Sequence, residues 1–64
     1  MVTYTVPNKY NPEGFDTFDL DADGTVVMHH PCYNPDRVEK IRVSTTSARF
    51  YRRAVESGVA EPVR

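Results

Sequence analysis

Cysteine is almost absent from this chain, since Cys32 is the one cysteine among 64 residues. A single thiol excludes an intramolecular disulfide framework of the kind that stabilises many small secreted domains. No run of apolar residues approaches the ~20 that a transmembrane helix needs, and the N-terminus lacks the pattern of a signal peptide. We therefore expect neither a membrane-spanning segment nor a secretory leader.

Large aliphatic side chains are also scarce, because Leu20 and Ile41 are the only leucine and isoleucine. Valine supplies most of the aliphatic side chains, and such a core suits a small sheet better than a helical bundle. The chain is 39% hydrophobic and 27% charged, a balance typical of a globular protein. Its length predicts one small domain, residues 1–64, with a thin core.

The net charge of −1 conceals a division between the two halves of the chain. Residues 1–32 hold one lysine against five carboxylates, giving −4, while residues 33–64 hold seven basic against four acidic side chains, giving +3. This asymmetry indicates a basic face for an acidic partner or packing between copies of the chain. The alternative is that the two charged faces simply meet within one fold.

Residues 2–6 have the alternation of apolar and polar residues that is typical of a strand, and two further strands are expected over residues 17–20 and 25–29. The last two are joined by Asp21-Ala22-Asp23-Gly24. Aspartate at the start of a turn and glycine in the left-handed position favour a tight hairpin loop. The sequence therefore predicts an antiparallel hairpin in this region.

The second half predicts one further strand and one helix. Alternation over residues 38–43 places Ile41 and Val43 on the inward side of a strand. A helix over residues 44–57 follows, because serine and threonine at its start can cap it and apolar residues then recur at helical spacing. Gly58 stands where a left-handed C-cap residue belongs, so we expect it to have a positive φ.

A short tail, residues 59–63, follows the helix. Val59 is placed to fold back onto Val55, and Pro62 limits the tail to an edge strand or an extended arm. Together these elements predict an α+β fold, a small and mainly antiparallel sheet with one C-terminal helix.

The expected helix carries basic residues on the face away from its apolar stripe. The stripe should pack on the sheet, which leaves three arginines outward as candidate partner-binding residues: Arg49, Arg52 and Arg53. The guanidinium group of arginine forms paired hydrogen bonds with carboxylates, so we expect an acidic protein surface opposite these arginines. The overall charge argues against nucleic acid as the partner. The alternative is that the arginines only solubilise the helix.

Residues 15–26 resemble the first two-thirds of an EF-hand calcium loop. Three carboxylates take positions one, three and five of that loop: Asp19, Asp21 and Asp23. His30 stands at position twelve, where the loop needs a bidentate glutamate, and prolines interrupt both flanking segments. A hairpin turn explains the same residues by its backbone requirements, and weak cation binding is the alternative.

Soft or borderline metal ligands cluster at His29, His30 and Cys32. A structural zinc site needs four ligands, usually in two spaced pairs, so we expect no metal or other cofactor within one chain. A metal site shared between subunits is the remaining alternative. No pairing of nucleophile and base is recognisable, and the chain is too small to enclose a substrate, so we expect no enzymatic activity.

Residues 47–59 resemble the C-terminal segment of short proteins in the structural modules of tailed phages. The shared pattern is a serine or threonine helix start, an aromatic pair, arginines, then glycine and a short apolar tail. The resemblance implies a small virion component of the head or tail, or an assembly component, without catalysis. It also implies a location in the virion or in the host cytoplasm.

Three hypotheses for function follow. The leading one is a structural or assembly component that binds a larger protein, or copies of itself, through the basic helix face and extended termini. The second is a small phage-type regulator that binds a host protein or nucleic acid. The third is a metal-dependent binding module built on the aspartate-rich turn.

Overall fold

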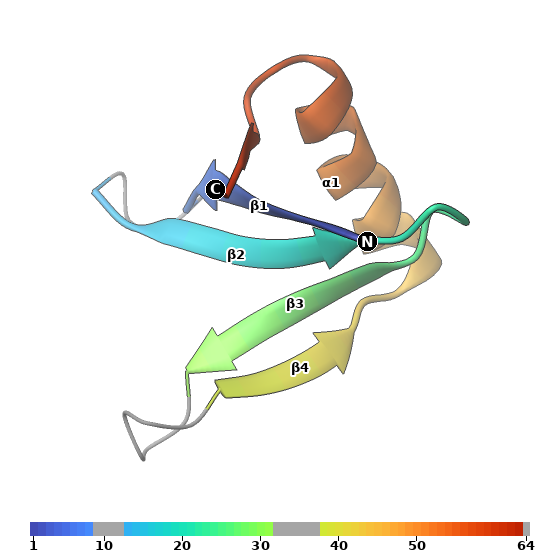
Figure 1. The fold of residues 1–64 in the computed structure, drawn as a ribbon, viewed down its shortest axis with the longest axis horizontal. Helices are drawn as coiled ribbons and strands as arrows, with labels where there is room; N and C mark the ends of the chain where they lie inside the picture. The colour runs from blue at the N-terminus through green and yellow to red at the C-terminus, as the bar shows by residue number, and fades with distance from the viewer. Residues whose placement is uncertain (9–12, 32–37, 64) are drawn as a thin grey trace.

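A computed structural model describes residues 1–8, 13–31 and 38–63. The chain forms a five-stranded antiparallel sheet and one helix, which confirms the predicted α+β class (Figure 1). In chain order the elements are β1 (Val2–Pro7), β2 (Phe15–Leu20), β3 (Val26–Pro31), β4 (Val38–Arg42), α1 (Thr45–Glu56) and β5 (Glu61–Pro62).

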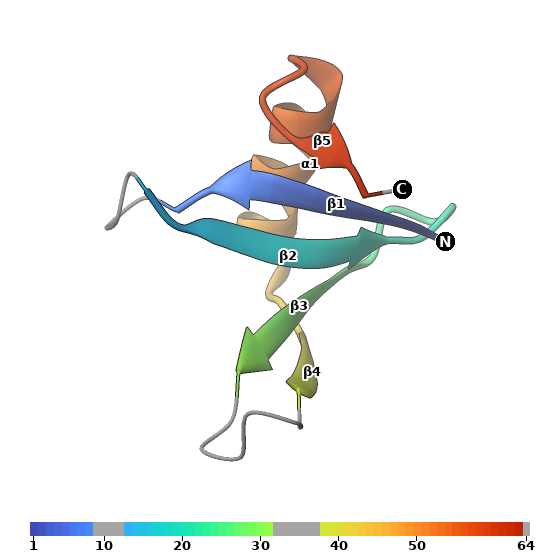
Figure 2. The same cartoon turned by 60° about the vertical axis from the view of Figure 1, so that its left-hand side comes forward.

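The strands lie in the order β4-β3-β2-β1-β5. The tail after the helix therefore returns to the N-terminal strand, where Glu61 pairs with Thr5 and Pro62 with Tyr4. Figure 2 shows β5 lying beside β1. The prediction that Pro62 lies in an edge strand is confirmed. Proline has no backbone N–H, so it cannot donate a hydrogen bond to a second neighbouring strand.

The predicted hairpin joins β2 to β3. Asp21 and Thr25 close the turn through a 3.0 Å hydrogen bond from the Asp21 amide to the Thr25 carbonyl oxygen. Gly24 adopts a φ of 89°, the left-handed conformation that the turn requires. Asp23 Oδ1 accepts a 2.9 Å hydrogen bond from the Thr25 amide, so this carboxylate braces the turn.

The helix begins and ends within a residue of its predicted limits. Ser44 caps it by accepting a 3.3 Å hydrogen bond at Oγ from the Ser47 amide. Beyond its end Gly58 has a φ of 81°, as expected for the residue that reverses the chain. Val59, the residue after it, is 55% exposed, and Ala60 is buried in the core.

One face of the sheet packs against the helix and forms the core. An aromatic series crosses it, with ring centroids 5.6 Å apart for Tyr4 and Phe18 and 5.0 Å apart for Phe18 and Tyr51. The buried apolar residues are Val6, Phe18, Val26, Met28, Ala48, Ala54 and Ala60. The helix therefore covers β1, β2 and β3, and its predicted apolar stripe, which includes Tyr51, Ala54 and Val55, faces the core.

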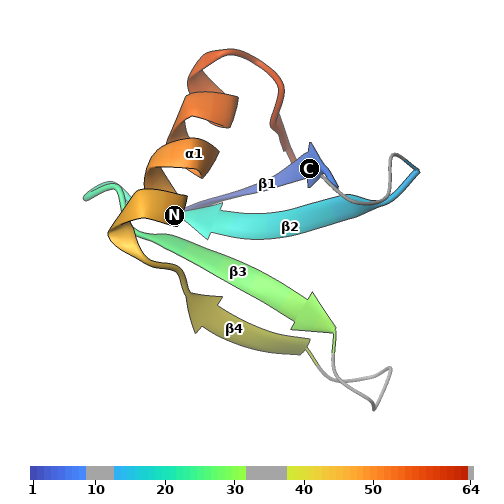
Figure 3. The same cartoon turned by 180° about the vertical axis from the view of Figure 1, so that it is seen from behind.

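Ile41 departs from its predicted burial. It lies in register with Met28 and so belongs to the helix-facing side of the sheet, yet it is 46% exposed. The reason is its place on β4, an edge strand on the far side of the sheet from β1 (Figure 3). Val43, at the end of that strand, packs against the core as expected.

Candidate partner-binding surface

The solvent-facing side of α1 combines basic and aromatic side chains. Arg49 and Arg53 are four residues apart, so they lie on the same side of the helix, and both are exposed. Phe50 adjoins them and is 58% exposed. Phe50 belongs to the aromatic pair noted in the sequence of residues 47–59 but was not among the predicted site residues.

Arg52 does not share this outward orientation. Its Nη1 donates a 2.8 Å hydrogen bond to the carbonyl oxygen of Gly24, and its side chain is half-buried. Arg52 therefore fastens the helix to the β2–β3 turn. Of the three arginines predicted to face a partner, the structure leaves Arg49 and Arg53 turned to solvent.

Two adjoining pockets lie between Phe50 on α1 and the end of β1, and together we call them the groove. The first, a cavity of about 370 Å³ that we call the apolar pocket, is lined by Val6, Pro7, Phe50, Arg53, Ala54, Ser57 and Val59. The second, a cavity of about 320 Å³ that we call the Asp16 pocket, is lined by Val6, Pro7, Asn8, Asp16, Ser47, Phe50 and Tyr51. Val6, Pro7 and Phe50 line both, so the two pockets adjoin each other.

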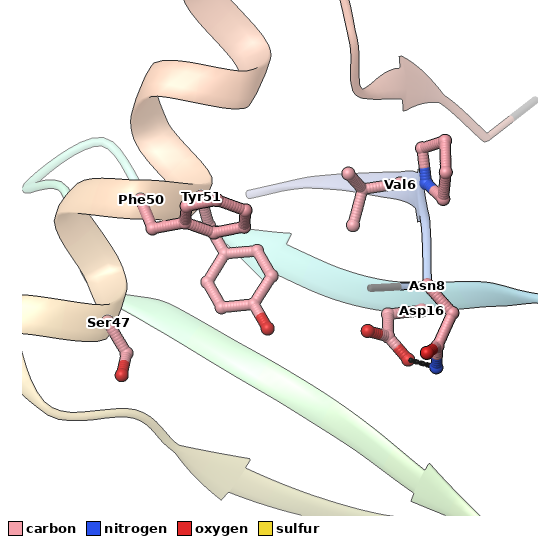
Figure 4. A pocket seen from close by; sticks show the side chains of 7 residues that line it. Val6, Asn8, Asp16, Ser47, Phe50 and Tyr51 are labelled. Carbon is pink, nitrogen blue, oxygen red and sulfur yellow. Dashed lines mark hydrogen bonds between the residues drawn. The ribbon is translucent and has the colours of Figure 1, made fainter. Parts of the chain in front are cut away.

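The walls of the Asp16 pocket differ in chemistry (Figure 4). Phe50 and Tyr51 form the helix wall, with ring planes 86° apart and centroids 5.3 Å apart. On the opposite wall the Asp16 carboxylate accepts a 3.0 Å hydrogen bond from Asn8 Nδ2. Burial, and then the negative charge of Asp16, raises the pKa of the Tyr51 hydroxyl. That hydroxyl therefore keeps its proton at neutral pH and can donate a hydrogen bond.

The opposite face of the sheet carries a charged cluster around Asp19, which is only 3% exposed. Asp19 Oδ1 accepts a 2.6 Å hydrogen bond from Thr3 Oγ1 and lies 3.0 Å from His29 Nε2. Lys40 Nζ lies 3.4 Å from Oδ2 of the same carboxylate. The Thr3 hydrogen bond, and after it the nearby His29 and Lys40 side chains, outweigh burial and hold the pKa of Asp19 below its ordinary value.

This placement separates the three aspartates that the sequence grouped. Asp19 is engaged within the sheet, and Asp23 is engaged with the backbone of its own turn. Among the described residues, no group of three or more histidine, cysteine, aspartate or glutamate side chains is placed to hold a metal ion. The hairpin interpretation is confirmed, and the carboxylates do not converge as in an EF-hand loop.

The histidine and cysteine cluster is also divided. His29 joins the Asp19 cluster, whereas His30 is exposed and, by strand alternation, points to the other face of β3. Cys32 lies outside the described residues. A metal site shared between subunits stays a hypothesis.

Comparisons with known proteins add nothing to this geometry. No protein-family model matches the chain, and no similar curated protein or solved structure is found. The resemblance to phage structural modules therefore stays a prediction. In the described part of the chain, no helix has the length and apolar character needed to cross a membrane.

Proposed function

We propose that this protein is a small non-catalytic assembly component that binds a protein partner through the outer face of α1 and the adjoining groove. The observation that carries the proposal is the exposed Phe50, which lines both pockets beside the exposed Arg53 of the apolar pocket, with Arg49 one helical turn before Arg53. The partner is a larger protein or further copies of this chain. The virion or host-cytoplasm location implied by the phage resemblance belongs to the same proposal.

The apolar part of this surface supports the proposal first. Phe50 and Val59 are each more than half exposed, and Val59 lines the same pocket as Phe50. Contiguous apolar groups on a small soluble protein favour association, because covering them removes apolar area from water. Aromatic side chains at the centre of an interface commonly contribute most of its binding energy.

The charges set the chemistry of the partner. Arg53 lines the apolar pocket and Arg49 is exposed one helical turn before it, so both can pair with carboxylates at the rim of an interface. Arginine is enriched at interfaces for this reason, together with aromatic residues. We therefore expect a partner surface with an apolar centre and acidic residues around it.

The alternative function is a regulator that binds a host protein or nucleic acid. Basic and aromatic side chains on one helix would suit nucleic acid. The net charge of −1 and the two outward arginines give little of the electrostatic attraction that such binding requires. Protein binding is therefore the function that the surface supports best.

Photo-crosslinking tests the proposal. A benzophenone amino acid is placed at position 50, and the protein is irradiated in the cells that produce it. We expect a protein adduct that disappears when Arg49 and Arg53 are both changed to glutamate. The matched control places the same amino acid at position 41, which is exposed on the far edge strand.

Each outcome decides between the alternatives. An adduct of twice the chain's mass identifies a second copy, and a heavier one identifies a larger partner. An adduct with nucleic acid would instead support the regulator. Equal crosslinking from positions 50 and 41 would remove the basis for assigning binding to α1.

A further inference from the structure

We infer that the groove between α1 and β1 is a self-association site, in which Arg53 of one copy enters the Asp16 pocket of a second copy. This inference rests on the proposed function and names the partner as another molecule of the same chain. Its basis is the opposite charge at the two ends of one groove.

The two pockets differ in the charge that they carry. Asp16 is the one charged side chain among the described residues that line its pocket. Arg53 is likewise the one charged side chain among those that line the apolar pocket. Because Val6, Pro7 and Phe50 line both pockets, the groove has an acidic end, an apolar middle and a basic end.

A groove of this kind is complementary to itself. In a dimer with two-fold symmetry the same patch is used by both copies, and each contact occurs twice. A two-fold axis near Phe50 exchanges the ends of the groove, so the acidic end of one copy faces the basic end of the other. The two phenylalanines then cover each other at the centre, where aromatic anchors contribute most.

The Asp16 pocket suits a guanidinium group. The carboxylate of Asp16 gives it an opposite charge, and the rings of Phe50 and Tyr51 offer faces on which a planar cation can stack. Figure 4 shows these rings and the carboxylate on facing walls of the pocket. The Tyr51 hydroxyl stays protonated, so the Asp16 carboxylate is the negative group that a guanidinium meets among the described residues of this pocket.

Charge reversal followed by charge exchange tests the inference. Sedimentation velocity over a micromolar to millimolar concentration series measures the dimer dissociation constant of the parent and the variants. Asp16→Lys alone and Arg53→Glu alone should each weaken dimerisation by about tenfold or more. The double variant should recover most of the loss, because it restores both ion pairs with their signs exchanged.

Two further variants control for loss of the fold and for a general effect of charge. Asp16→Asn keeps an acceptor for Asn8 while removing the charge, so it should weaken dimerisation without harming the fold, as checked by thermal melting. Arg42→Glu makes the same charge change as Arg53→Glu on β4, and we expect it to leave the dissociation constant unchanged.

The outcomes separate this inference from the function on which it rests. A parent chain that stays monomeric at every concentration would overturn the self-association site. Single variants that weaken the dimer without recovery in the double variant would overturn the pairing of Asp16 with Arg53. In either case, crosslinking from position 50 to a larger protein would leave the proposed function in place.

Discussion

The guanidinium of Arg52 donates a 2.8 Å hydrogen bond to the backbone carbonyl of Gly24, which lies 28 residues earlier in the chain. This bond joins the middle of α1 to the β2–β3 turn. Arg52 therefore has a structural role that Arg49 and Arg53 lack, because these two side chains are exposed and join no other element in the described structure.

Replacing Arg52 should therefore affect stability more than replacing Arg49. We expect Arg52→Ala to lower the free energy of unfolding by about 1 kcal/mol, since it removes a charge-assisted hydrogen bond from a half-buried site. Arg49→Ala is the matched control and should change stability by less than about 0.5 kcal/mol. Urea denaturation measures both, and equal losses would contradict a tethering role for Arg52.

Thr3 should prove important for stability through its bond to Asp19. Thr3→Val keeps the shape of the side chain but leaves the buried carboxylate without its shortest hydrogen bond. We expect the free energy of unfolding to fall by about 1–3 kcal/mol. Thr5→Val, two residues along the same face of β1, is the control and should have little effect. Similar denaturation midpoints for the two variants would argue against the Asp19 cluster as a source of stability.

The same carboxylate predicts how stability depends on pH. The pKa of Asp19 is lower in the folded protein than in the unfolded chain, where an aspartate titrates near 3.9. Its stabilising effect is therefore complete above about pH 5 and is lost as the pH falls through the unfolded-state and then the folded-state pKa. Thermal melts from neutral to acidic pH should show Asp19→Asn less stable than the parent at pH 7. The two proteins should converge at low pH, and a constant difference would refute this assignment.

Gly58 should tolerate few substitutions because of its backbone conformation. A side chain at this position would meet no atom within 4 Å, so any cost arises from the φ of 81°. We expect Gly58→Val to destabilise the protein by on the order of 1 kcal/mol or more. Gly58→Asn should cost less, because asparagine adopts the left-handed conformation more readily. If both variants have the melting temperature of the parent, glycine is not required at this end of the helix.

The aspartate-rich hairpin should bind calcium weakly. Asp19 and Asp23 already serve the sheet and the turn, and His30 replaces the bidentate glutamate of an EF-hand loop. We therefore expect a calcium dissociation constant in the millimolar range or weaker, measured by calorimetric titration. A micromolar constant that is lost in Asp21→Asn would show that the hairpin rearranges to bind the ion.

Local sequence was sufficient for the elements whose geometry depends on neighbouring residues. The helix after Ser44, its end at Gly58 and the hairpin turn at Gly24 all follow from capping, periodicity and the conformational freedom of glycine. These requirements act within a few residues of the chain. For that reason they can be recognised without knowing what lies across the fold.

Tertiary structure decided the features that depend on distant partners. The alternating pattern of residues 38–43 predicts that Ile41 is buried, but its strand lies at an edge of the sheet that the helix does not cover. Arg52 has the spacing of a solvent-facing arginine, but a turn from another part of the chain reaches it. The groove likewise exists only because α1 crosses the sheet beside β1 and brings Phe50 near Asp16. The sequence alone determined which side chains each element carries, whereas the packing of the helix on the sheet determined which of them meet.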